Sequence, residues 1–372
     1  MTLVGVLGAG QLGRMLAIAG RKLDLQFRFL DASPDAPAAE FGEMVVGAFD
    51  DPQALDRFSD GVDVVTYEFE NVPVASARRL AEMVRVLPPP ASLAAAQDRL
   101  EEKRLFTSLG VPTAPFEAVY DEVSLRSAAE RVGLPAVLKT RRLGYDGKGQ
   151  RVVREMSDLD AAWRTIGERP AILEGFVRFD RELSVIAVRG RRGEMAFYPL
   201  IENVHRDGVL RRSHAPAPDV VEGLQKDAEG HARRLCEELG HVGVLTLELF
   251  ERGGALLANE MAPRVHNSGH WTIEGAATSQ FENHLRAILG MELGATSTEG
   301  ACVMLNLLGW VPERGVFEGM PGAPGVTLHD YGKKPAPMRK VGHVTVCGAD
   351  REMVEARVDV VCERLRMAGW EE

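Results

Sequence analysis

One segment near the middle of the chain constrains the fold and the ligand more than any other. Residues 135–140 form a short apolar strand pattern that includes Lys139, and residues 144–150 follow as a charged loop with three glycines. Glycines let backbone N–H groups approach phosphate oxygens closely, and a lysine on a strand adds a fixed positive charge. The loop matches neither the GxxxxGK[ST] phosphate loop nor the kinase GxGxxG motif. The segment therefore predicts a polyphosphate site of another type.

The length and composition indicate a globular protein with more than one domain. The chain has 372 residues, of which 45% are hydrophobic and 26% charged, so the length prior gives two or three domains. No apolar run is long enough to span a bilayer, and the chain enters a strand pattern directly after Met1, without a basic leader. We expect a cytoplasmic protein that does not associate with membranes.

Charge and cysteine usage exclude further classes. The net charge of −10 argues against a nucleic-acid-binding surface, although a local basic pocket for a phosphorylated small molecule is compatible with it. The cysteines are far apart and lack metal-binding spacing, so we expect buried free thiols rather than disulfides. They are Cys236, Cys302, Cys347 and Cys362.

Two kinds of α/β organisation follow each other along the chain. Strand patterns at residues 3–7, 26–30 and 62–66 alternate with helical patterns at 11–22 and 52–58, which predicts a doubly wound parallel sheet that ends near Pro88. One charged helix is expected at residues 92–109, and the rest reads as α+β. Strands are expected at 137–139, 150–153, 171–174, 182–188, 243–251, 255–260 and 342–347, and helices at 157–166, 222–239, 280–289 and 351–367.

A glycine motif at the start of the chain supports a competing interpretation. Gly8, Gly10 and Gly13 match GxGxxG between a strand and a helix, and Asp31 follows the next strand. Alone, this pattern predicts a nicotinamide-dependent oxidoreductase. The same glycines can simply form a tight turn whose helix N-terminus holds any anion. We favour the turn, because residues 135–150 already provide a nucleotide site.

Two acidic residues lie at the ends of neighbouring strand patterns. Glu248 and Glu260 flank a predicted hairpin turn at residues 253–254, so the hairpin makes them neighbours. Carboxylates, together with the amide oxygen of Asn259, are ligands suited to Mg²⁺ that bridges phosphates. Solvated strand ends are the plain alternative, but the lysine strand and the glycine loop favour a metal site.

A dense polar run follows the second of these strands. Arg264 can clamp an anion with two hydrogen bonds, while His266, Asn267 and Ser268 add neutral donors. An ordinary polar loop is the alternative. The position of the run, directly after the predicted metal site, favours a role in binding.

These motifs together resemble the ATP-grasp superfamily and, within it, the N5-carboxyaminoimidazole ribonucleotide synthetase family. The resemblance extends essentially from end to end and rests on residues 8–15, 67–72, 144–150, 259–270, 331–333 and 339–343. It implies an ATP-grasp fold with an N-terminal doubly wound parallel-sheet domain and a small C-terminal domain. The implied bounds are residues 1–95, 96–295, with a lid at about 113–177, and 296–372.

The resemblance also implies which residues bind ATP. Phosphates would contact Arg99, Lys139, Gly144, Tyr145, Asp146, Gly147, Lys148, Gly149 and Gln150. The adenine would contact Glu174, Gly175, Phe176 and Val177, the ribose Glu182, and His205 and Asn259 would complete the site. Glu248 and Glu260 would bind two Mg²⁺ ions.

The implied reaction is the ATP-dependent carboxylation of 5-aminoimidazole ribonucleotide in purine biosynthesis. ATP would phosphorylate bicarbonate to carboxyphosphate, and CO₂ released from it would convert the 5-amino group into a carbamate. Candidates for holding bicarbonate and its adduct are Lys148, Arg264, His266 and Asn267. Candidates for the nucleotide substrate are Gln11, Leu12, Glu70, Tyr145, Asp146, Ser268, Lys333, Arg339 and Lys340. A homodimer is the family expectation.

Three alternatives stay open on sequence alone. The nearest is another ATP-grasp ligase, a formate-dependent formyltransferase that acts on glycinamide ribonucleotide. The others are the nicotinamide-dependent oxidoreductase suggested by Gly8 to Gly13 and Asp31, and a nucleotide-sensing module without catalysis.

Overall fold

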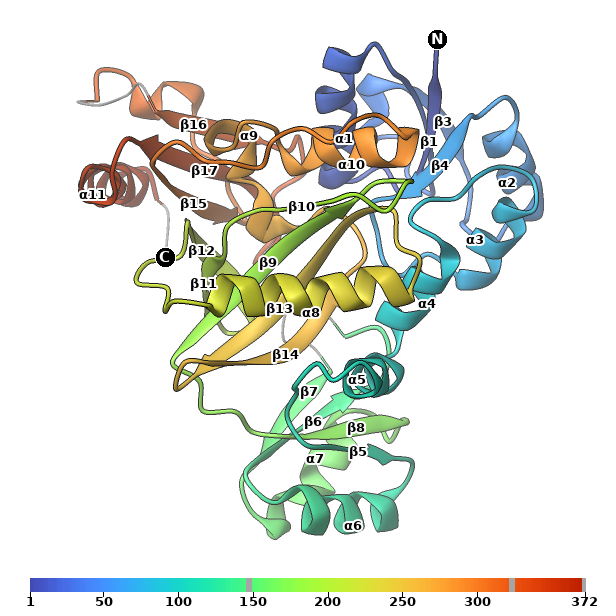
Figure 1. Ribbon diagram of the computed structural model, residues 1–372, viewed down its shortest axis with the longest axis vertical. Helices are drawn as coiled ribbons and strands as arrows, with labels where there is room; N and C mark the ends of the chain where they lie inside the picture. Colours follow the sequence, from blue (N-terminus) through green and yellow to red (C-terminus); the bar gives the residue numbers. More distant parts are fainter. Residues whose placement is uncertain (145–148, 321–324, 370–372) are drawn as a thin grey trace.

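The computed structural model describes residues 1–144, 149–320 and 325–369, and three sheets organise them (Figure 1). The N-terminal domain and the C-terminal segment lie at one end of the elongated molecule, and a small lid lies at the other (Figure 1). In the part of the chain described, no helix combines the length and apolar character needed to cross a membrane.

The N-terminal sheet is fully parallel, in the order β3-β2-β1-β4. This confirms the expected parallel sheet, with the addition of β3, a four-residue strand too short to stand out in the sequence. Its elements are β1 Leu3–Leu7, α1 Gln11–Gly20, η1 Arg21–Leu23, β2 Gln26–Asp31, η2 Ala39–Phe41, β3 Glu43–Val46, α2 Pro52–Ser59, β4 Val64–Tyr67 and α3 Val74–Ala81.

The single helix expected at residues 92–109 is two helices, α4 Pro90–Gln97 and α5 Arg99–Ser108. Asp98 between them has extended backbone angles, and its carboxylate accepts from the Leu100 N–H and from the guanidinium of Arg141. The prediction was wrong here because a side chain that caps a helix N-terminus competes with helix continuation, and the partner Arg141 is far away in the sequence.

The lid is a four-stranded antiparallel sheet, ordered β5-β8-β6-β7, with two helices packed on one face. The sequence predicted β6, β7 and β8 but missed β5 and α6, although Asp121 forms a capping box with Ser124 at the start of α6. The elements are β5 Phe116–Val119, α6 Glu122–Val132, β6 Ala136–Thr140, β7 Gln150–Val153, η3 Met156–Asp158, α7 Leu159–Thr165 and β8 Ala171–Gly175.

The third sheet is the largest, with nine strands, and it carries the C-terminal segment as well. The order is β14-β13-β9-β11-β12-β15-β17-β16, with β10 beside β9, and the pairings are antiparallel. The strands are β9 Arg181–Arg189, β10 Met195–Phe197, β11 Ile201–Arg206, β12 Val209–Ala215, β13 Gly243–Arg252, β14 Ala255–Ala262, β15 Ala301–Leu308, β16 Val326–Asp330 and β17 Lys340–Gly348. Because β12 pairs with β15, the last region of the chain extends the central sheet.

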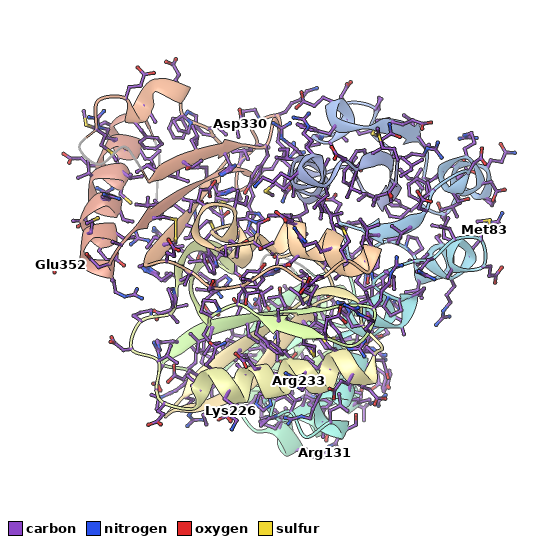
Figure 2. The ribbon with its side chains drawn as sticks, turned by 45° about the horizontal axis from the view of Figure 1, so that its top comes forward. Met83, Arg131, Lys226, Arg233, Asp330 and Glu352 are labelled. Atoms are coloured by element: carbon purple, nitrogen blue, oxygen red, sulfur yellow. A yellow bond between two sulfur atoms is a disulfide. The ribbon has the colours of Figure 1, made fainter. Side chains whose placement is uncertain are left out.

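Amphipathic helices cover this sheet. Helix α8 buries its apolar side on one face, whereas α10 packs on the other and α11 covers β15 and β17. The outward sides of α6, α8 and α11 carry exposed charges such as Arg131, Lys226 and Glu352 (Figure 2). The remaining helices are α8 Leu224–Glu238, η4 Asn267–Gly269, α9 Thr272–Gly275, α10 Gln280–Leu289, η5 Arg314–Phe317 and α11 Arg351–Met367.

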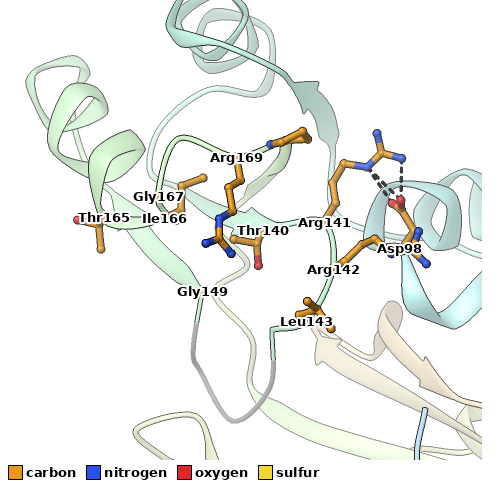
Figure 3. A pocket seen from close by; sticks show the side chains of 11 residues that line it. Asp98, Thr140, Arg141, Arg142, Leu143, Gly149, Thr165, Ile166, Gly167 and Arg169 are labelled. Carbon is orange, nitrogen blue, oxygen red and sulfur yellow. Dashed lines mark hydrogen bonds and ion pairs between the residues drawn. The ribbon is translucent and has the colours of Figure 1, made fainter. Parts of the chain in front are cut away.

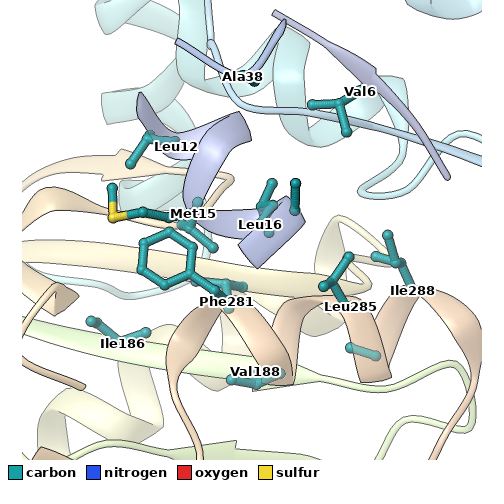
Figure 4. Packing of buried hydrophobic residues seen from close by; sticks show 14 of the residues in the cluster. Val6, Leu12, Met15, Leu16, Ala38, Ile186, Val188, Phe281, Leu285 and Ile288 are labelled. Carbon is teal, nitrogen blue, oxygen red and sulfur yellow. The ribbon is translucent and has the colours of Figure 1, made fainter. Parts of the chain in front are cut away.

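The N-terminal domain is fixed to the central sheet by a continuous apolar core. Leu12 and Leu16 of α1 pack with Phe281 and Leu285 of α10 above Ile186 of β9 (Figure 4). Full burial of such side chains contributes roughly 1.5–3 kcal/mol each. The interface therefore holds the glycine turn of the N-terminal domain in a fixed position over the central sheet.

The expectation of four free cysteines was wrong for one pair. Cys302 and Cys347 lie directly opposite each other on β15 and β17 and form a disulfide, whereas Cys236 and Cys362 are buried thiols outside any disulfide, as expected. The pairing depends on the register of two strands 45 residues apart, which cysteine spacing does not reveal.

Candidate active site

The two predicted metal carboxylates face each other. In the β13–β14 hairpin, Glu248 is directly opposite Glu260, with a bulge immediately after Glu248. Burial alone would raise the pKa of Glu248, but the hydrogen bond from His266, followed by nearby positive charge that includes Lys340, lowers it to about 2. Desolvation, and then the like charge of Glu248, raise the pKa of Glu260, whose side chain is still about half exposed (47%). The two carboxylates therefore differ, because the pKa of Glu248 is lowered and that of Glu260 is raised.

A buried charge cluster links the lid to these strands. Glu174 Oε2 lies 3.2 Å from Lys139 Nζ and 3.2 Å from Lys103 Nζ. Lys103 is almost fully buried and also donates to the carbonyls of Ala258 and Asn259. Burial raises the pKa of Glu174, but the two lysines outweigh that effect and lower it to about 2.

Lys103 was not among the predicted residues. The signal that could have identified it is its position one helical turn after Arg99, where a charged residue falls on the inward side of α5. A buried lysine needs a charged or strongly polar partner, so its presence on an inward face predicts a carboxylate nearby.

The ends of the glycine loop are held by side-chain contacts. Arg99 donates to the carbonyls of Thr140 and Gly144, at 3.1 and 3.0 Å. Gly149 has φ +72°, and a Cβ there would lie 2.7 Å from Thr140 Oγ1, so only glycine fits without strain. Four predicted ligand residues of this loop lie outside the described residues, namely Tyr145, Asp146, Gly147 and Lys148. Gln150 begins β7.

The predicted adenine and ribose residues lie where the lid joins the central sheet. The amides of Gly175 and Phe176 donate to the carbonyls of Pro115 and Pro135, and the Phe176 ring is exposed, as is expected of a ligand-facing residue; Val177 follows directly. Glu182 Oε2 lies 2.8 Å from His205 Nδ1. His205 lies in strand β11, a strand that was not among those expected from the sequence.

His205 is held by electrostatics as well as by the strand. Burial lowers the pKa of His205, but the hydrogen bond and charge of Glu182 outweigh this and raise it. Glu182 and His205 therefore form a hydrogen-bonded polar pair. The charge of Glu248 also raises the pKa of the imidazole.

The polar run after β14 contacts one of the predicted metal carboxylates and also the N-terminal domain. Arg264 pairs with Glu70, and His266 Nε2 lies 3.1 Å from Glu248 Oε1. Asn267 exchanges two amide hydrogen bonds with Asn306 of β15, at 3.1 and 2.7 Å. Asn306 was also missed by sequence reasoning, since nothing near it in the chain marks it as part of a site.

Ser268 is fully buried beneath His266, within hydrogen-bond distance of its Nδ1 (2.9 Å). The buried hydroxyl contacts His266, and the contact with substrate expected from the sequence stays a prediction.

The glycine turn at the N-terminus of α1 already holds an anion supplied by the protein. The amides of Gly10, Leu12 and Gly13 donate to the carboxylate of Glu68, at 2.8, 3.1 and 3.1 Å, and Gln11 lies between them. Asp31 accepts from the amide of Ala9 within the same turn. The turn is therefore occupied as a dinucleotide phosphate would occupy it, which argues against the oxidoreductase.

Two lysines of the C-terminal segment act electrostatically on this turn and on one of the predicted metal carboxylates. Desolvation raises the pKa of Glu68, and the charges of Lys333 and Arg264 oppose that rise. The charge of Lys340 likewise acts on Glu248. Arg339 donates to the carbonyl of Lys334. Charges from distant parts of the sequence thus act on the carboxylates of this region.

A separate cavity of about 580 Å³ lies on the lid, beside the glycine loop (Figure 3). Arg169 and Thr140 line it, and the Asp98–Arg141 pair forms part of its wall (Figure 3). Lys139, Glu174 and Glu260 do not line it, so it lies next to the predicted triphosphate site without being that site.

Comparisons with known proteins cover almost the whole chain. Family models match at residues 1–97 (ribonucleotide synthetase preATP-grasp domain), 104–281 (ATP-grasp domain) and 302–357 (phosphoribosylaminoimidazole carboxylase C-terminal domain). The N5-carboxyaminoimidazole ribonucleotide synthase of Pseudomonas aeruginosa is 49% identical over 355 residues, which cover 95% of this chain and 97% of that protein.

Solved structures also match almost the whole chain. The N5-carboxyaminoimidazole ribonucleotide synthetase of Thermus thermophilus is 54% identical, with a TM-score of 0.92 over 99% of this chain and 100% of that one. The Aspergillus clavatus enzyme, solved in complex with ADP and 5-aminoimidazole ribonucleotide, is 30% identical, with a TM-score of 0.91 over 98% and 99% of the two chains.

Proposed function

This chain belongs to the N5-carboxyaminoimidazole ribonucleotide synthase family of ATP-grasp enzymes, and from that premise we propose how its site carries out the reaction. The protein is an ATP-dependent ligase that carboxylates 5-aminoimidazole ribonucleotide in purine biosynthesis. The named relatives favour this activity over the formate-dependent formyltransferase.

The observation that carries the assignment of roles is the facing pair of Glu248 and Glu260 beside the Lys139–Glu174 cluster. Mg²⁺ is usually held by one or two carboxylates together with substrate phosphates, which is the donor set available here. Glu248 and Glu260 would hold the metal. Burial, and then the charge of Glu248, raise the pKa of Glu260, and a bound cation would offset both effects. The chemistry that Mg²⁺ would supply when bound is neutralisation of negative charge on the transferring phosphoryl group.

ATP would lie between the lid and the central sheet. Lys139, Arg99 and the glycine loop would contact the phosphates, and Glu182 would accept from the ribose hydroxyls. Glu174 Oε1 is buried and has no hydrogen-bond partner among the described residues, which supports a donor on the ligand, such as the adenine amino group. Phe176 is exposed at the hinge and offers a flat apolar surface to the base.

The acceptor side of the cleft would hold bicarbonate. Arg264, His266 and Asn267, with Lys148, are our candidates for this role. A bicarbonate oxygen attacks the γ-phosphorus and ADP leaves, which gives carboxyphosphate. Carboxyphosphate releases CO₂ and phosphate, and the 5-amino nitrogen attacks CO₂ and loses a proton to give the carbamate. Because the intermediate hydrolyses readily, closure of the lid protects it from water.

The substrate phosphate would be bound by cations of the C-terminal segment, Lys333, Arg339 and Lys340. Glu70, Tyr145 and Asp146 would orient the ribose and the amine. The turn at Gln11 and Leu12 would contribute only if Glu68 moves from it, since the amide of Leu12 now donates to that carboxylate.

The deciding experiment is an ADP-release assay in which each acceptor is supplied in turn. We expect turnover with 5-aminoimidazole ribonucleotide and bicarbonate together, and a loss of the nucleotide-dependent turnover when bicarbonate is omitted. Turnover with formate and glycinamide ribonucleotide would contradict the proposal in favour of the formyltransferase. We also propose a homodimer, to be checked by light scattering on the purified protein.

A further inference from the structure

A chain of buried polar side chains runs through the central sheet and ends at the candidate metal site. Ser213 Oγ lies 2.8 Å from Asn203 Oδ1, and Asn203 Nδ2 lies 2.9 Å from Ser184 Oγ. Ser184 Oγ in turn lies 3.0 Å from Ser268 Oγ, which lies 2.9 Å from His266 Nδ1. The other imidazole nitrogen, Nε2, lies 3.1 Å from Glu248 Oε1.

The sheet register places the strand members of this chain on one face. Ser184 of β9 is directly opposite Glu248 of β13, and Asn203 of β11 is directly opposite Ser213 of β12. Asn203 is also opposite Glu182, two residues before Ser184, and residues two apart on a strand share a face. The diagonal from Asn203 to Ser184 therefore stays on the face that carries the metal carboxylates.

The burial of these groups is costly unless every one of them is hydrogen-bonded. Ser184, Ser213 and Ser268 are fully buried, and Asn203 is 5% exposed. An unpaired buried hydroxyl or amide costs about 1–3 kcal/mol. Apolar residues on the same strands would avoid that cost, so the four polar residues together need a reason that packing does not provide.

The direction of donation is determined at both ends of the chain. The backbone N–H of Ser268 can only donate, and it points to His266 Nδ1, so that nitrogen accepts. The carboxylate of Glu248 accepts at the opposite end. Each member between them then donates to the next, from Ser213 through Asn203, Ser184 and Ser268 to His266, and hydrogen bonds aligned in this way strengthen one another.

We propose that Ser184, Asn203 and Ser213, acting through Ser268, are positioning residues that hold His266 as the neutral tautomer with its proton on Nε2. The imidazole then presents one N–H to Glu248 and to the cleft, and it does so before any ligand binds. The importance of this tautomer for catalysis rests on the proposed function of His266. The presence of the tautomer does not depend on that function.

The first test reads the tautomer directly by ¹⁵N NMR of histidine-labelled, ligand-free protein, with His266→Gln used to assign the signals. We expect the shift and coupling pattern of an Nε2-protonated, Nδ1-accepting ring at neutral pH. A ring protonated at Nδ1, or a rapidly averaging ring, would overturn the proposal whatever reaction the enzyme catalyses.

The second test interrupts the chain in the middle. Ser184→Ala should lower kcat about 10- to 100-fold, as loss of a group that orients a ligand commonly does, with little change in the KM for ATP. Ser184→Thr keeps the hydroxyl and should restore most of the lost activity. Thr246→Val is the matched control, because Thr246 is buried on β13 and its hydroxyl has no partner in the described part of the chain.

The pattern across these variants decides between positioning and simple packing. Equal losses for Ser184→Ala and Thr246→Val, or no rescue by Ser184→Thr in a protein that still folds, would show that the hydroxyl only fills space. If Ser184→Ala does not fold, Ser213→Ala at the far end tests the same idea with a smaller expected loss. Turnover with formate in every variant would refute the proposed function without affecting the tautomer result.

Discussion

Two glycine-rich segments in this protein have backbone amides that an anion can approach, but only one of them holds an anion supplied by the protein. In the N-terminal turn, the amides of Gly10, Leu12 and Gly13 hold the carboxylate of Glu68. In the lid loop, no carboxylate accepts from a backbone amide of the described residues 141–144 and 149–150, and Arg99 braces the loop through carbonyls. Glycines therefore indicate where an anion can be held, and a residue distant in sequence decides whether the protein fills that place itself.

The largest effect is expected at the predicted ATP site beside the lid loop, where the described part of the loop holds no carboxylate of the protein. Glu260→Gln removes one of the two facing acids, so the triphosphate loses its metal support, and turnover should fall roughly 10²–10³-fold or more. ADP release measures the loss, and circular dichroism checks that the fold is retained. Glu43→Gln, at an exposed acid on an edge strand, should behave like the wild type. Unchanged turnover in Glu260→Gln would contradict the proposed role of Glu260 in supporting the triphosphate through a metal.

The next prediction concerns the charge cluster beside the lid loop. The pKa of Glu174 is about 2, below its ordinary value of 4.5, so the ionised carboxylate stabilises the folded state above pH 4.5. That contribution, roughly 3 kcal/mol at most, is lost as the pH falls from about 4.5 to about 2. The stability difference between the wild type and Glu174→Gln, measured by urea unfolding, should narrow over that range.

A matched variant separates this effect from general acid denaturation. Asp160→Asn removes an exposed carboxylate of the lid that pairs with Arg126, and it should differ little from the wild type at any pH. A constant difference between wild type and Glu174→Gln down to pH 2 would mean that the buried lysines do not depend on Glu174.

A smaller effect is expected where the protein holds its own anion. Glu68→Ala removes the acceptor of three amides at the start of α1, which should lower the free energy of unfolding by about 2 kcal/mol. It should also expose those amides to an external anion, so inorganic phosphate should raise the Tm of the variant more than that of the wild type. If phosphate raised the Tm of the variant and of the wild type equally, the proposed difference between the N-terminal turn and the lid loop would be wrong.

The smallest effect sharpens the comparison at a single glycine. Gly149→Ala places a Cβ against Thr140 on a residue with left-handed backbone angles, and it should lower the free energy of unfolding by about 1 kcal/mol. We expect the KM for ATP to rise by more than this loss of stability alone would explain. Gly61→Ala is a close control, because Gly61 has φ +70° and nothing within 4 Å of an added Cβ. If both variants raise the KM equally, the geometry of the lid loop does not matter for ATP binding.

Local patterns predicted much of the fold and the facing acids of the site. Strand β6 with Lys139 and the hairpin with Glu248 and Glu260 follow from apolar runs, a turn and polar strand ends, all of which lie within a few residues of each other. The parallel N-terminal sheet follows from alternation of strands and helices.

The features that sequence reasoning missed depend on partners far along the chain. Lys103 is explained by Glu174 and by carbonyls more than 150 residues away, and Glu68 by amides 55 to 58 residues before it. The break at Asp98 and the Cys302–Cys347 pair likewise need the folded register. No local propensity encodes such contacts, because they form only when distant elements pack.

The continuity of the nine-stranded sheet has a mechanical consequence. Its ladder joins the strands that carry the two acids to the strand that begins at Lys340, whereas the four strands of the lid form a sheet of their own. Lys340, a proposed ligand of the substrate phosphate, therefore belongs to the same sheet as the two acids, whereas Lys139 and Glu174 belong to the separate sheet of the lid. A displacement of the lid as a unit would thus leave the spacing between Lys340 and the two acids unchanged.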